Sequence, residues 1–281
     1  MLQRHDVENY HDGIIIMDHF YSHINGWSHY LEVLYQHLVP KLPASCEIVE
    51  VGCWKGRSTA FLAVTLIQYG KVFRLHAVDH WKGCLEGYYQ NSQVAQELRD
   101  DKVFDDFKQN LAPVAKHMNI IRSNSVDAAA QFEDNSLDMV TIDDDHLYES
   151  VINSIVAWAP KIKPGGFLCG DDCDGHYPGV ERAVRTAFGE NWVLLNDSGD
   201  IIFNTKLPLD AGSWIWTKPE NWVLPTIQEM PADPWAPKLP EPVVEEPVIE
   251  ELVVEEPVIE EPIEPEIPVS TLQNNKQHVI V

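Results

Sequence analysis

The chain has 281 residues, of which 44 are acidic and 20 are Lys or Arg, so its formal net charge is −24. Nucleic-acid phosphates repel such an acidic protein, and we therefore expect no nucleic-acid partner. The five cysteines include no CxxC pair, and no apolar run has the length of a signal-peptide core or a membrane span. These features favour a cytoplasmic protein with no disulfide framework, zinc site or membrane partner.

The first 45 residues predict a helical cap on the core. Apolar residues from Trp27 to Leu38 recur at helical spacing. Pro40 and Pro43 then end the helix and set up the first strand.

Residues 46–205 predict a single α/β domain. The expected strands are 48–51, 73–78, 118–121, 137–142 and 166–169, and the expected helices are 57–69, 93–111, 125–132, 147–160 and 178–188. Continuous apolar strands that alternate with helices favour a mostly parallel, Rossmann-like sheet with helices on both faces. Two further apolar runs, 192–195 and 201–203, flank a polar turn and predict a hairpin, so that one strand of the sheet runs antiparallel.

Two segments of different composition follow. We interpret residues 206–235, rich in Trp and Pro, as an irregular segment that either packs on the core or serves as a substrate lid. Residues 236–281 repeat Glu-Glu-Pro-Val-Ile-Glu-Glu at 245–251 and 255–261. Frequent proline and dense like charge predict a disordered acidic tail, whose Val-Ile pairs could engage a protein partner.

A glycine-bearing turn and a strand-end carboxylate indicate a nucleoside site. Glu50, Gly52 and Gly56 follow the pattern E-x-G-x-x-x-G, which is not the G-x-G-x-x-G of pyrophosphate binding. Glu50 is costly to bury alone, and a cationic ammonium group or loop amides would satisfy it. Asp79 ends the neighbouring strand, where a carboxylate can bind a ribose diol, although an exposed loop acid is the simpler interpretation.

Further polar residues end the later strands. Ser125 is expected to cap the helix after the third strand and to lie near the adenine end of the ligand. Asp143 follows the fourth strand, and Asp171 and Asp172 follow the fifth, so these carboxylates should converge at one edge of the sheet. Three clustered carboxylates need a cation or raised pKa values, and oxygen ligands favour Mg²⁺. The alternative is a solvated acidic loop.

The order of these motifs carries a family resemblance. The motifs are Glu50-x-Gly52-x-x-x-Gly56-x-Ser58, Val78-Asp79-His80-Trp81-Lys82-Gly83, Ile142-Asp143-x-Asp145-His146-x-Tyr148-Glu149, Lys163-Pro164-Gly165-Gly166 and Gly170-Asp171-Asp172. Together they resemble the class I S-adenosylmethionine-dependent methyltransferases over residues 45–205. More narrowly, they are similar to the metal-dependent sugar O-methyltransferases of macrolide and aminocoumarin biosynthesis and to cephalosporin hydroxylase-like proteins.

The resemblance implies a seven-stranded sheet whose last strand pair supplies the antiparallel member. It also implies a set of residues around S-adenosylmethionine: Glu50, Gly52, Gly56, Ser58, Asp79, Ser125 and Asp143. In the sugar methyltransferases, the acids that match Asp143, Asp171 and Asp172 hold Mg²⁺, and the acid that matches Asp145 is the proposed general base. Asp144 departs from the family pattern, because Gly or Ala is usual at that position.

We therefore expect Mg²⁺-assisted methylation of a small hydroxyl-bearing substrate such as a sugar, with Asp145 or else His146 as the proton acceptor. Two alternatives stay open. One is a metal-independent methyltransferase, and the other is a non-catalytic cofactor-binding adaptor tethered by the acidic tail. A nicotinamide dehydrogenase is disfavoured because the third glycine of its fingerprint is absent. The oligomeric state, including a homo-oligomer, stays open.

Overall fold

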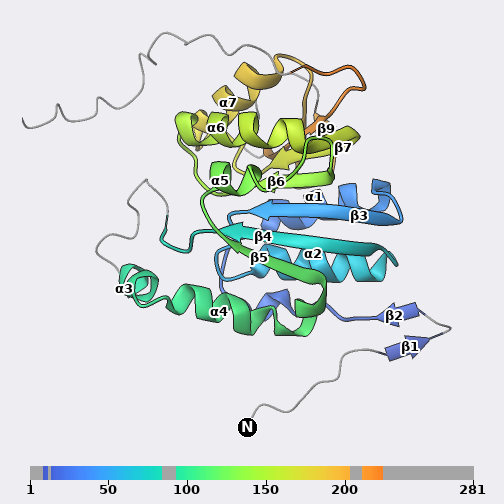
Figure 1. Ribbon diagram of the computed structural model, residues 1–281, viewed down its shortest axis with the longest axis vertical. Coiled ribbons are helices and arrows are strands. Elements are labelled where there is room, and N and C mark those ends of the chain that lie inside the picture. The colour runs from blue at the N-terminus through green and yellow to red at the C-terminus, as the bar shows by residue number, and fades with distance from the viewer. Residues whose placement is uncertain (1–8, 12–13, 84–92, 203–210, 224–281) are drawn as a thin grey trace, which may run out of the picture. The chain divides into compact units, whose positions relative to one another are not determined.

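The computed structural model describes residues 9–11, 14–83, 93–202 and 211–223, which all belong to one compact unit, Met1–Met230 (Figure 1). The predicted acidic tail lies outside the described residues, as does much of the Trp/Pro-rich segment. Among the helices of the described part, none combines the length and the apolar character needed to cross a membrane.

An eight-stranded sheet forms the centre of this unit. Its strands, in spatial order, are β5 (Met118–Arg122), β4 (Val72–Asp79), β3 (Ser45–Val51), β6 (Leu137–Ile142), β7 (Ile162–Gly170), β10 (Ala211–Thr217), β8 (Val193–Asn196) and β9 (Ile201–Ile202). The first five strands are parallel, and Figure 1 shows β6, β3, β4 and β5 side by side. Their carboxyl ends therefore meet at one edge, as the sequence predicts.

The antiparallel part of the sheet differs from the expectation. The predicted hairpin is present as β8 and β9, but β10 inserts between β7 and β8 and pairs antiparallel with both. The sheet thus has eight strands rather than seven. Residues 211–217, expected in an irregular segment, form this buried strand. Trp214 and Trp216 of β10 are almost fully buried, and this burial drives the strand into the sheet.

Helices cover both faces of the sheet. One face packs against α1 (His29–Leu38), α2 (Arg57–Gln68) and α4 (Lys102–Asn110), and the other packs against α5 (Ser125–Ala129), α6 (Tyr148–Trp158) and α7 (Pro178–Phe188). Each face has its own apolar core. The helix predicted from the spacing between Trp27 and Leu38 is present as α1, whose apolar face lies in the first of these cores. A two-stranded hairpin, β1 (Asn9–His11) and β2 (Ile14–Ile16), precedes it.

One predicted helix is divided in the structure, and one predicted helix cap is wrong. The segment 93–111 forms two helices, α3 (Gln93–Arg99) and α4, because Asp101 between them has φ +56° and cannot continue a right-handed helix. The N-cap of α5 is Asn124, whose side chain accepts a hydrogen bond from the Asp127 amide at 2.9 Å. The prediction that Ser125 caps this helix is therefore wrong, because Ser125 is the first residue inside it.

Candidate active site

The glycine turn after β3 lies where three strand ends meet. Gly52 has φ +88°, and its amide donates to the Val78 carbonyl of β4 at 2.9 Å. A Cβ at Gly52 would lie 1.9 Å from the backbone oxygen of Asp143, which follows β6. Only glycine fits this close approach, and the requirement joins the turn directly to the predicted metal-binding loop.

Gly56 ends the same turn and caps α2. It also has φ +88°, and an added Cβ would lie 2.1 Å from the Leu111 side chain. Ser58 is buried in the first turn of α2, beside backbone amides that have no partner within the helix. Both predicted residues thus lie at a helix N-terminus that faces the carboxyl edge of the sheet.

Glu50 is fully buried at the end of β3. The Tyr35 hydroxyl on α1 donates to its Oε1 at 2.8 Å, whereas Oε2 has no hydrogen-bond partner among the described residues. Burial raises the pKa of Glu50 above its ordinary value. A buried carboxylate with one unused oxygen suits a cationic ligand group, as the sequence predicts.

The Asp79 carboxylate accepts hydrogen bonds from the loop after β3 and from the loop after β4. Its Oδ2 accepts from the Trp54 amide at 2.9 Å, and its Oδ1 accepts from the Trp81 amide at 2.6 Å. Both tryptophans have positive φ, +48° and +54°, and these hydrogen bonds help to hold that unfavourable backbone. Burial raises the pKa of Asp79, although the two amides oppose the shift. Each carboxylate oxygen retains a lone pair for a ribose hydroxyl.

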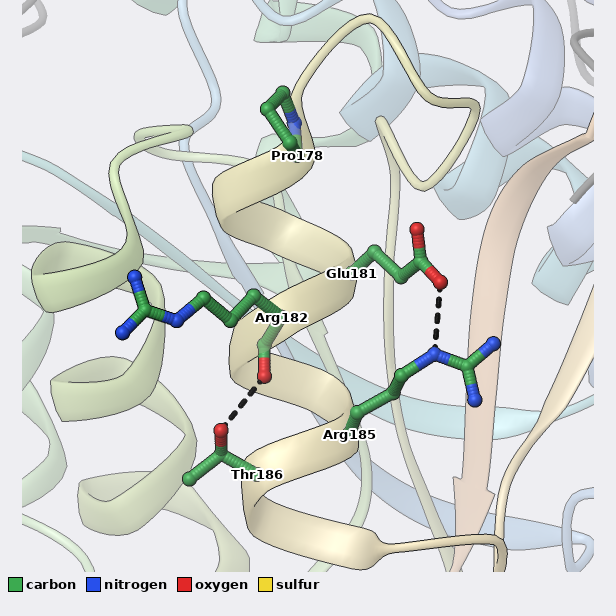
Figure 2. Close-up of a pocket in the computed structure, with 5 residues that line it drawn as sticks. All are labelled: Pro178, Glu181, Arg182, Arg185 and Thr186. Carbon is green, nitrogen blue, oxygen red and sulfur yellow. Dashed lines mark hydrogen bonds and ion pairs between the residues drawn. The ribbon is translucent and has the colours of Figure 1, made fainter. Parts of the chain in front are cut away.

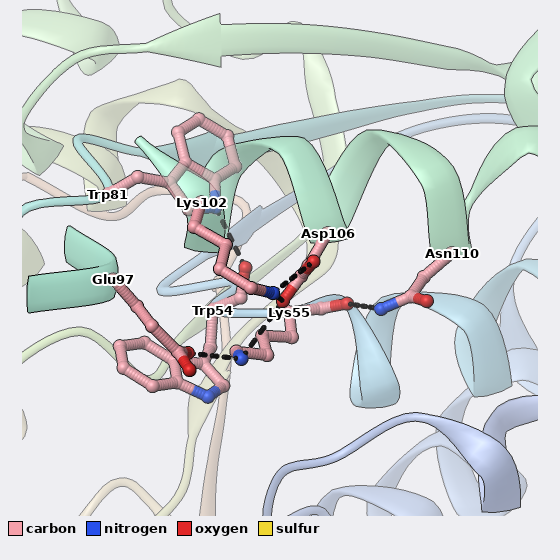
Figure 3. A network of polar contacts seen from close by, with 7 residues as sticks. All are labelled: Trp54, Lys55, Trp81, Glu97, Lys102, Asp106 and Asn110. Atoms are coloured by element: carbon pink, nitrogen blue, oxygen red, sulfur yellow. Dashed lines mark hydrogen bonds and ion pairs between the residues drawn. The ribbon is translucent and has the colours of Figure 1, made fainter. Parts of the chain in front are cut away.

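An ionic network supports these loops from outside the sheet. Lys55 pairs with Glu97 of α3 at 2.8 Å and with Asp106 of α4 at 3.0 Å, and Asn110 donates to the Lys55 carbonyl at 2.8 Å (Figure 3). The Trp81 indole donates to the Trp54 carbonyl at 2.7 Å. No local sequence pattern indicates this network, because Lys55 is distant in the sequence from α3 and α4.

Ser125 lies on the opposite face of the sheet from α2. Its hydroxyl accepts from the Trp158 indole at 3.0 Å and contacts the Ser154 hydroxyl at 2.8 Å. The Ser154 hydroxyl also lies 3.3 Å from Oδ2 of Asp144. Burial raises the pKa of Asp144 to about 6. Ser125 and Asp144 are thus linked through two residues of α6.

Three side chains come together as a candidate metal site: Asp143, His146 and Asp172. One ligand atom from each lies within 4.8 Å of the others. Burial, followed by the charges of Asp172 and Asp171, raises the pKa of Asp143 well above its ordinary value. Such crowding of carboxylates is relieved by a cation, so the donor set fits a divalent ion.

Asp171 lies beside this group but outside it. Its Oδ1 accepts from the Ser213 hydroxyl of β10 at 3.3 Å. Burial and the charge of Asp172 raise the pKa of Asp171. The structure therefore brings two of the three predicted metal-binding acids into one cluster and adds His146, whereas Asp171 faces Ser213.

The two predicted proton acceptors have different surroundings. Asp145 accepts from the His146 amide and from the Ser150 hydroxyl, both at 2.9 Å, so its two oxygens stabilise the loop before α6. The His146 ring makes a 2.8 Å contact with Oδ2 of Asp172 and stacks on Tyr177 with ring centroids 4.0 Å apart. No motif in the sequence indicated Tyr177.

A separate hollow of about 430 Å³ runs along α7. It is lined by Pro178, Glu181, Arg182, Arg185 and Thr186, and Figure 2 shows Arg185 reaching Glu181, with 2.7 Å between Nε and Oε1. None of the predicted site residues lines it. The candidate active site is therefore the carboxyl edge of the sheet rather than this hollow.

One family model matches part of the chain. Residues 49–173, from the end of β3 to the loop after β7, match the model of a methyltransferase domain, and this stretch includes the glycine turn. The match covers less than half of the chain, so this segment is similar to a methyltransferase domain. No curated protein sequence matches the chain.

Solved structures similar to this chain are distant. The O-methyltransferase NovP is 17% identical, with a TM-score of 0.47, and the match covers 68% of this chain and 78% of NovP. TomG from Streptomyces achromogenes, solved with S-adenosylmethionine, is 15% identical with a TM-score of 0.45, and covers 69% and 82%. A putative rRNA methylase from Clostridium thermocellum is 13% identical with a TM-score of 0.45, and covers 67% and 95%. No acceptor follows from these likenesses.

Proposed function

We propose that this protein transfers the methyl group of S-adenosylmethionine to a hydroxyl oxygen of a small molecule such as a sugar, with the help of Mg²⁺. The observation that carries this proposal is the convergence of Asp143, His146 and Asp172 beside the Gly52 turn. A cation placed there would be adjacent to a cofactor held by that turn. The sugar class comes from the sequence resemblance.

The buried carboxylates at the ends of β3 and β4 support the cofactor's position. Glu50 has a free Oε2 for the ammonium group, and the N-terminus of α2 with Ser58 suits the carboxylate of the methionine moiety. Asp79 would hold the ribose hydroxyls. Bound in this way, S-adenosylmethionine supplies an electrophilic methyl group on its sulfonium.

The cation would be held by Asp143 and Asp172, with Asp171 or His146 beside them. A divalent ion held there would lower the pKa of the acceptor hydroxyl, which a sugar hydroxyl needs before it can act as a nucleophile. The carboxylates would position the ion, and the sheet edge would orient the acceptor towards the methyl group. Asp145 stays the proposed proton acceptor in this version of the reaction.

The test is a calorimetric titration of Mg²⁺ into the protein saturated with S-adenosylhomocysteine. We expect saturable binding by the wild type and its loss in Asp172→Asn, because that change removes a charged ligand. Asp174→Asn is the matched control, since the Asp174 carboxylate is already engaged by the His176 amide at 2.9 Å. Equal binding by Asp172→Asn and the wild type would contradict the metal site.

A second candidate function is metal-independent methylation. The 2.8 Å contact between His146 and Asp172 favours it, because a carboxylate orients an imidazole and strengthens it as a base. In this version His146 takes the proton from an oxygen or nitrogen nucleophile. Full methyl transfer in the presence of EDTA would favour this candidate, whereas activity restored only by Mg²⁺ would favour the first.

A further inference from the structure

The candidate metal site contains a nitrogen donor. Nε2 of His146 lies 2.8 Å from Oδ2 of Asp172, and these two residues form, with Asp143, the group whose ligand atoms lie within 4.8 Å of one another. Two atoms bound at right angles to one ion, with bonds of about 2.1 Å, are about 3 Å apart. The observed separation therefore suits two neighbouring ligands of a single cation.

The Asp143 carboxylate gives a second, independent indication of a cation. Within the part of the chain that the structure describes, no hydrogen bond or ion pair reaches this carboxylate, and the charged groups that shift its pKa are acids. A shielded carboxylate with acidic neighbours and no donor is unfavourable, and a positive ion between the carboxylates removes that cost.

The imidazole of His146 is held in this position from α7. The Tyr177 ring stacks on it, with ring centroids 4.0 Å apart and 22° between the ring planes. A Cβ at Gly179, in the first turn of α7, would lie 2.3 Å from the His146 carbonyl oxygen, so the start of α7 lies directly against the loop that carries His146. The stacking orients the ring and the backbone contact holds the loop, so that Nε2 faces Asp172 before an ion binds.

The donor set differs from one made of oxygen atoms alone. Mg²⁺ takes oxygen ligands and keeps several waters, whereas an imidazole nitrogen suits Fe²⁺, Zn²⁺ and other first-row transition ions. Oδ1 of Asp171, the acid that would complete an oxygen-only set, accepts from the Ser213 hydroxyl at 3.3 Å. Two carboxylates and one imidazole therefore favour a transition ion.

We propose that Nε2 of His146 is a ligand of the cation, and that the site consequently prefers a first-row transition ion such as Fe²⁺ or Zn²⁺ to Mg²⁺. This inference rests on the cation site of the proposed function and names the class of ion that the site takes. It departs from the oxygen-only set that the sequence resemblance implies, in which Asp171 is the third ligand.

The first test compares Co²⁺, as the probe for transition ions, with Mg²⁺ by calorimetry on the cofactor-free protein. We expect His146→Gln to lower the affinity for Co²⁺ about tenfold or more, since changes to the partners of metal ligands already cost roughly 10–100-fold. The affinity for Mg²⁺ should change much less, because Mg²⁺ gains little from a nitrogen ligand. The ratio of the two affinities should therefore fall in the variant.

His176→Gln is the matched control. His176 lies in the loop after β7, is exposed, and has its Nδ1 3.1 Å from Oδ2 of Asp174, outside the group formed by Asp143, His146 and Asp172. Its replacement removes an imidazole from the same loop as Asp172 and should leave both affinities as in the wild type.

The second test identifies the ligand atom and needs no variant. Pulsed electron paramagnetic resonance of Mn²⁺ bound to the wild type detects the magnetic coupling of the ion to a directly bound nitrogen. We expect that coupling in the wild type and in His176→Gln, and its loss in His146→Gln.

Three results would overturn the inference. The wild type could bind Mn²⁺ without a nitrogen coupling, or His146→Gln could keep the wild-type ratio of Co²⁺ to Mg²⁺ affinity. In either case the cation site itself would stand as an oxygen-only site. If the wild type binds none of the three ions, the cation site of the proposed function fails, and the inference fails with it.

Discussion

Glu50 is a fully buried carboxyl group at the end of β3. It is faced by Tyr35 from α1, by Ser58 and Thr59 from α2, and by Asp79 and Asp143 from β4 and the loop after β6. Among the described residues, these groups that act on its pKa include two acids and no cation. Burial raises the pKa of Glu50 above its ordinary value of 4.5. The folded protein therefore keeps a proton on Glu50 at pH values where the unfolded chain has released it.

This shift predicts a pH dependence of stability. As pH rises from about 4.5 through the raised pKa, Glu50 lowers the free energy of unfolding, because its ionised form is disfavoured only in the folded state. Glu50→Gln keeps an acceptor for Tyr35 and removes the charge. Its stability relative to the wild type should therefore increase over this range.

Chemical denaturation of the cofactor-free protein between pH 5 and pH 8 measures this difference. Parallel stability curves for the wild type and Glu50→Gln would contradict the raised pKa. The substitution also removes the Glu50 charge, which helps to raise the pKa of Asp143, and this changes the difference in the same direction.

The positions of some single residues could be predicted from the sequence, and those of others could not. Gly52 and Asp79 were predictable, since a strand-end glycine and a strand-end acid mark the edge of a parallel sheet. The N-cap of α5 is Asn124 and not the predicted Ser125. Serine and asparagine cap helices about equally well, so residue type does not distinguish these two neighbours. The position of His146 beside Asp172 depends on the loop backbone, which no sequence pattern specifies.

At the scale of elements, β10 is the main difference from the predicted fold. Its sequence is Ala-Gly-Ser-Trp-Ile-Trp-Thr, and residues 212–216 are buried on both faces, so the strand shows no simple alternation. The segment is a strand because it pairs with β7 on one side and β8 on the other. These partners are distant in the sequence, so the local sequence pattern does not predict the pairing. The parallel strands were predictable because each is a continuous apolar run between turn signals.

The end of β10 is fixed by a buried lysine. The Lys218 ammonium donates to the Asn135 side chain at 2.9 Å and to the carbonyls of Pro160 and Ile162 at 3.0 and 2.8 Å. Lys218→Met should lower the free energy of unfolding by about 2–3 kcal/mol, because buried acceptors lose their donor.

Thermal or urea unfolding measures this loss, with Lys161→Met as the matched control. Lys161 pairs with the exposed carboxylate of Asp134, so its replacement should cost less than about 1 kcal/mol. Equal effects of the two substitutions would show that the Lys218 contacts do not stabilise β10.

At the scale of the whole domain, the parallel strands bring residues from distant parts of the sequence to one edge. Gly52, Asp79, Ser125 and Asp143 follow four different strands, and the eight-stranded sheet sets their spacing. Two apolar cores, one on each face, hold that sheet. The class of fold and the edge that carries the site follow from this arrangement, whereas the acceptor depends on loops and termini whose sequences carry no readable code.

The most direct test is a calorimetric titration of the wild-type protein with S-adenosylhomocysteine, with NAD as the comparison ligand. We predict saturable binding of one S-adenosylhomocysteine per chain and no binding of NAD. This prediction follows from the glycine turn at Gly52, the unpaired Oε2 of Glu50 among the described residues, and Asp79 at the end of β4. Absence of S-adenosylhomocysteine binding, or binding of NAD in its place, would contradict the methyltransferase site.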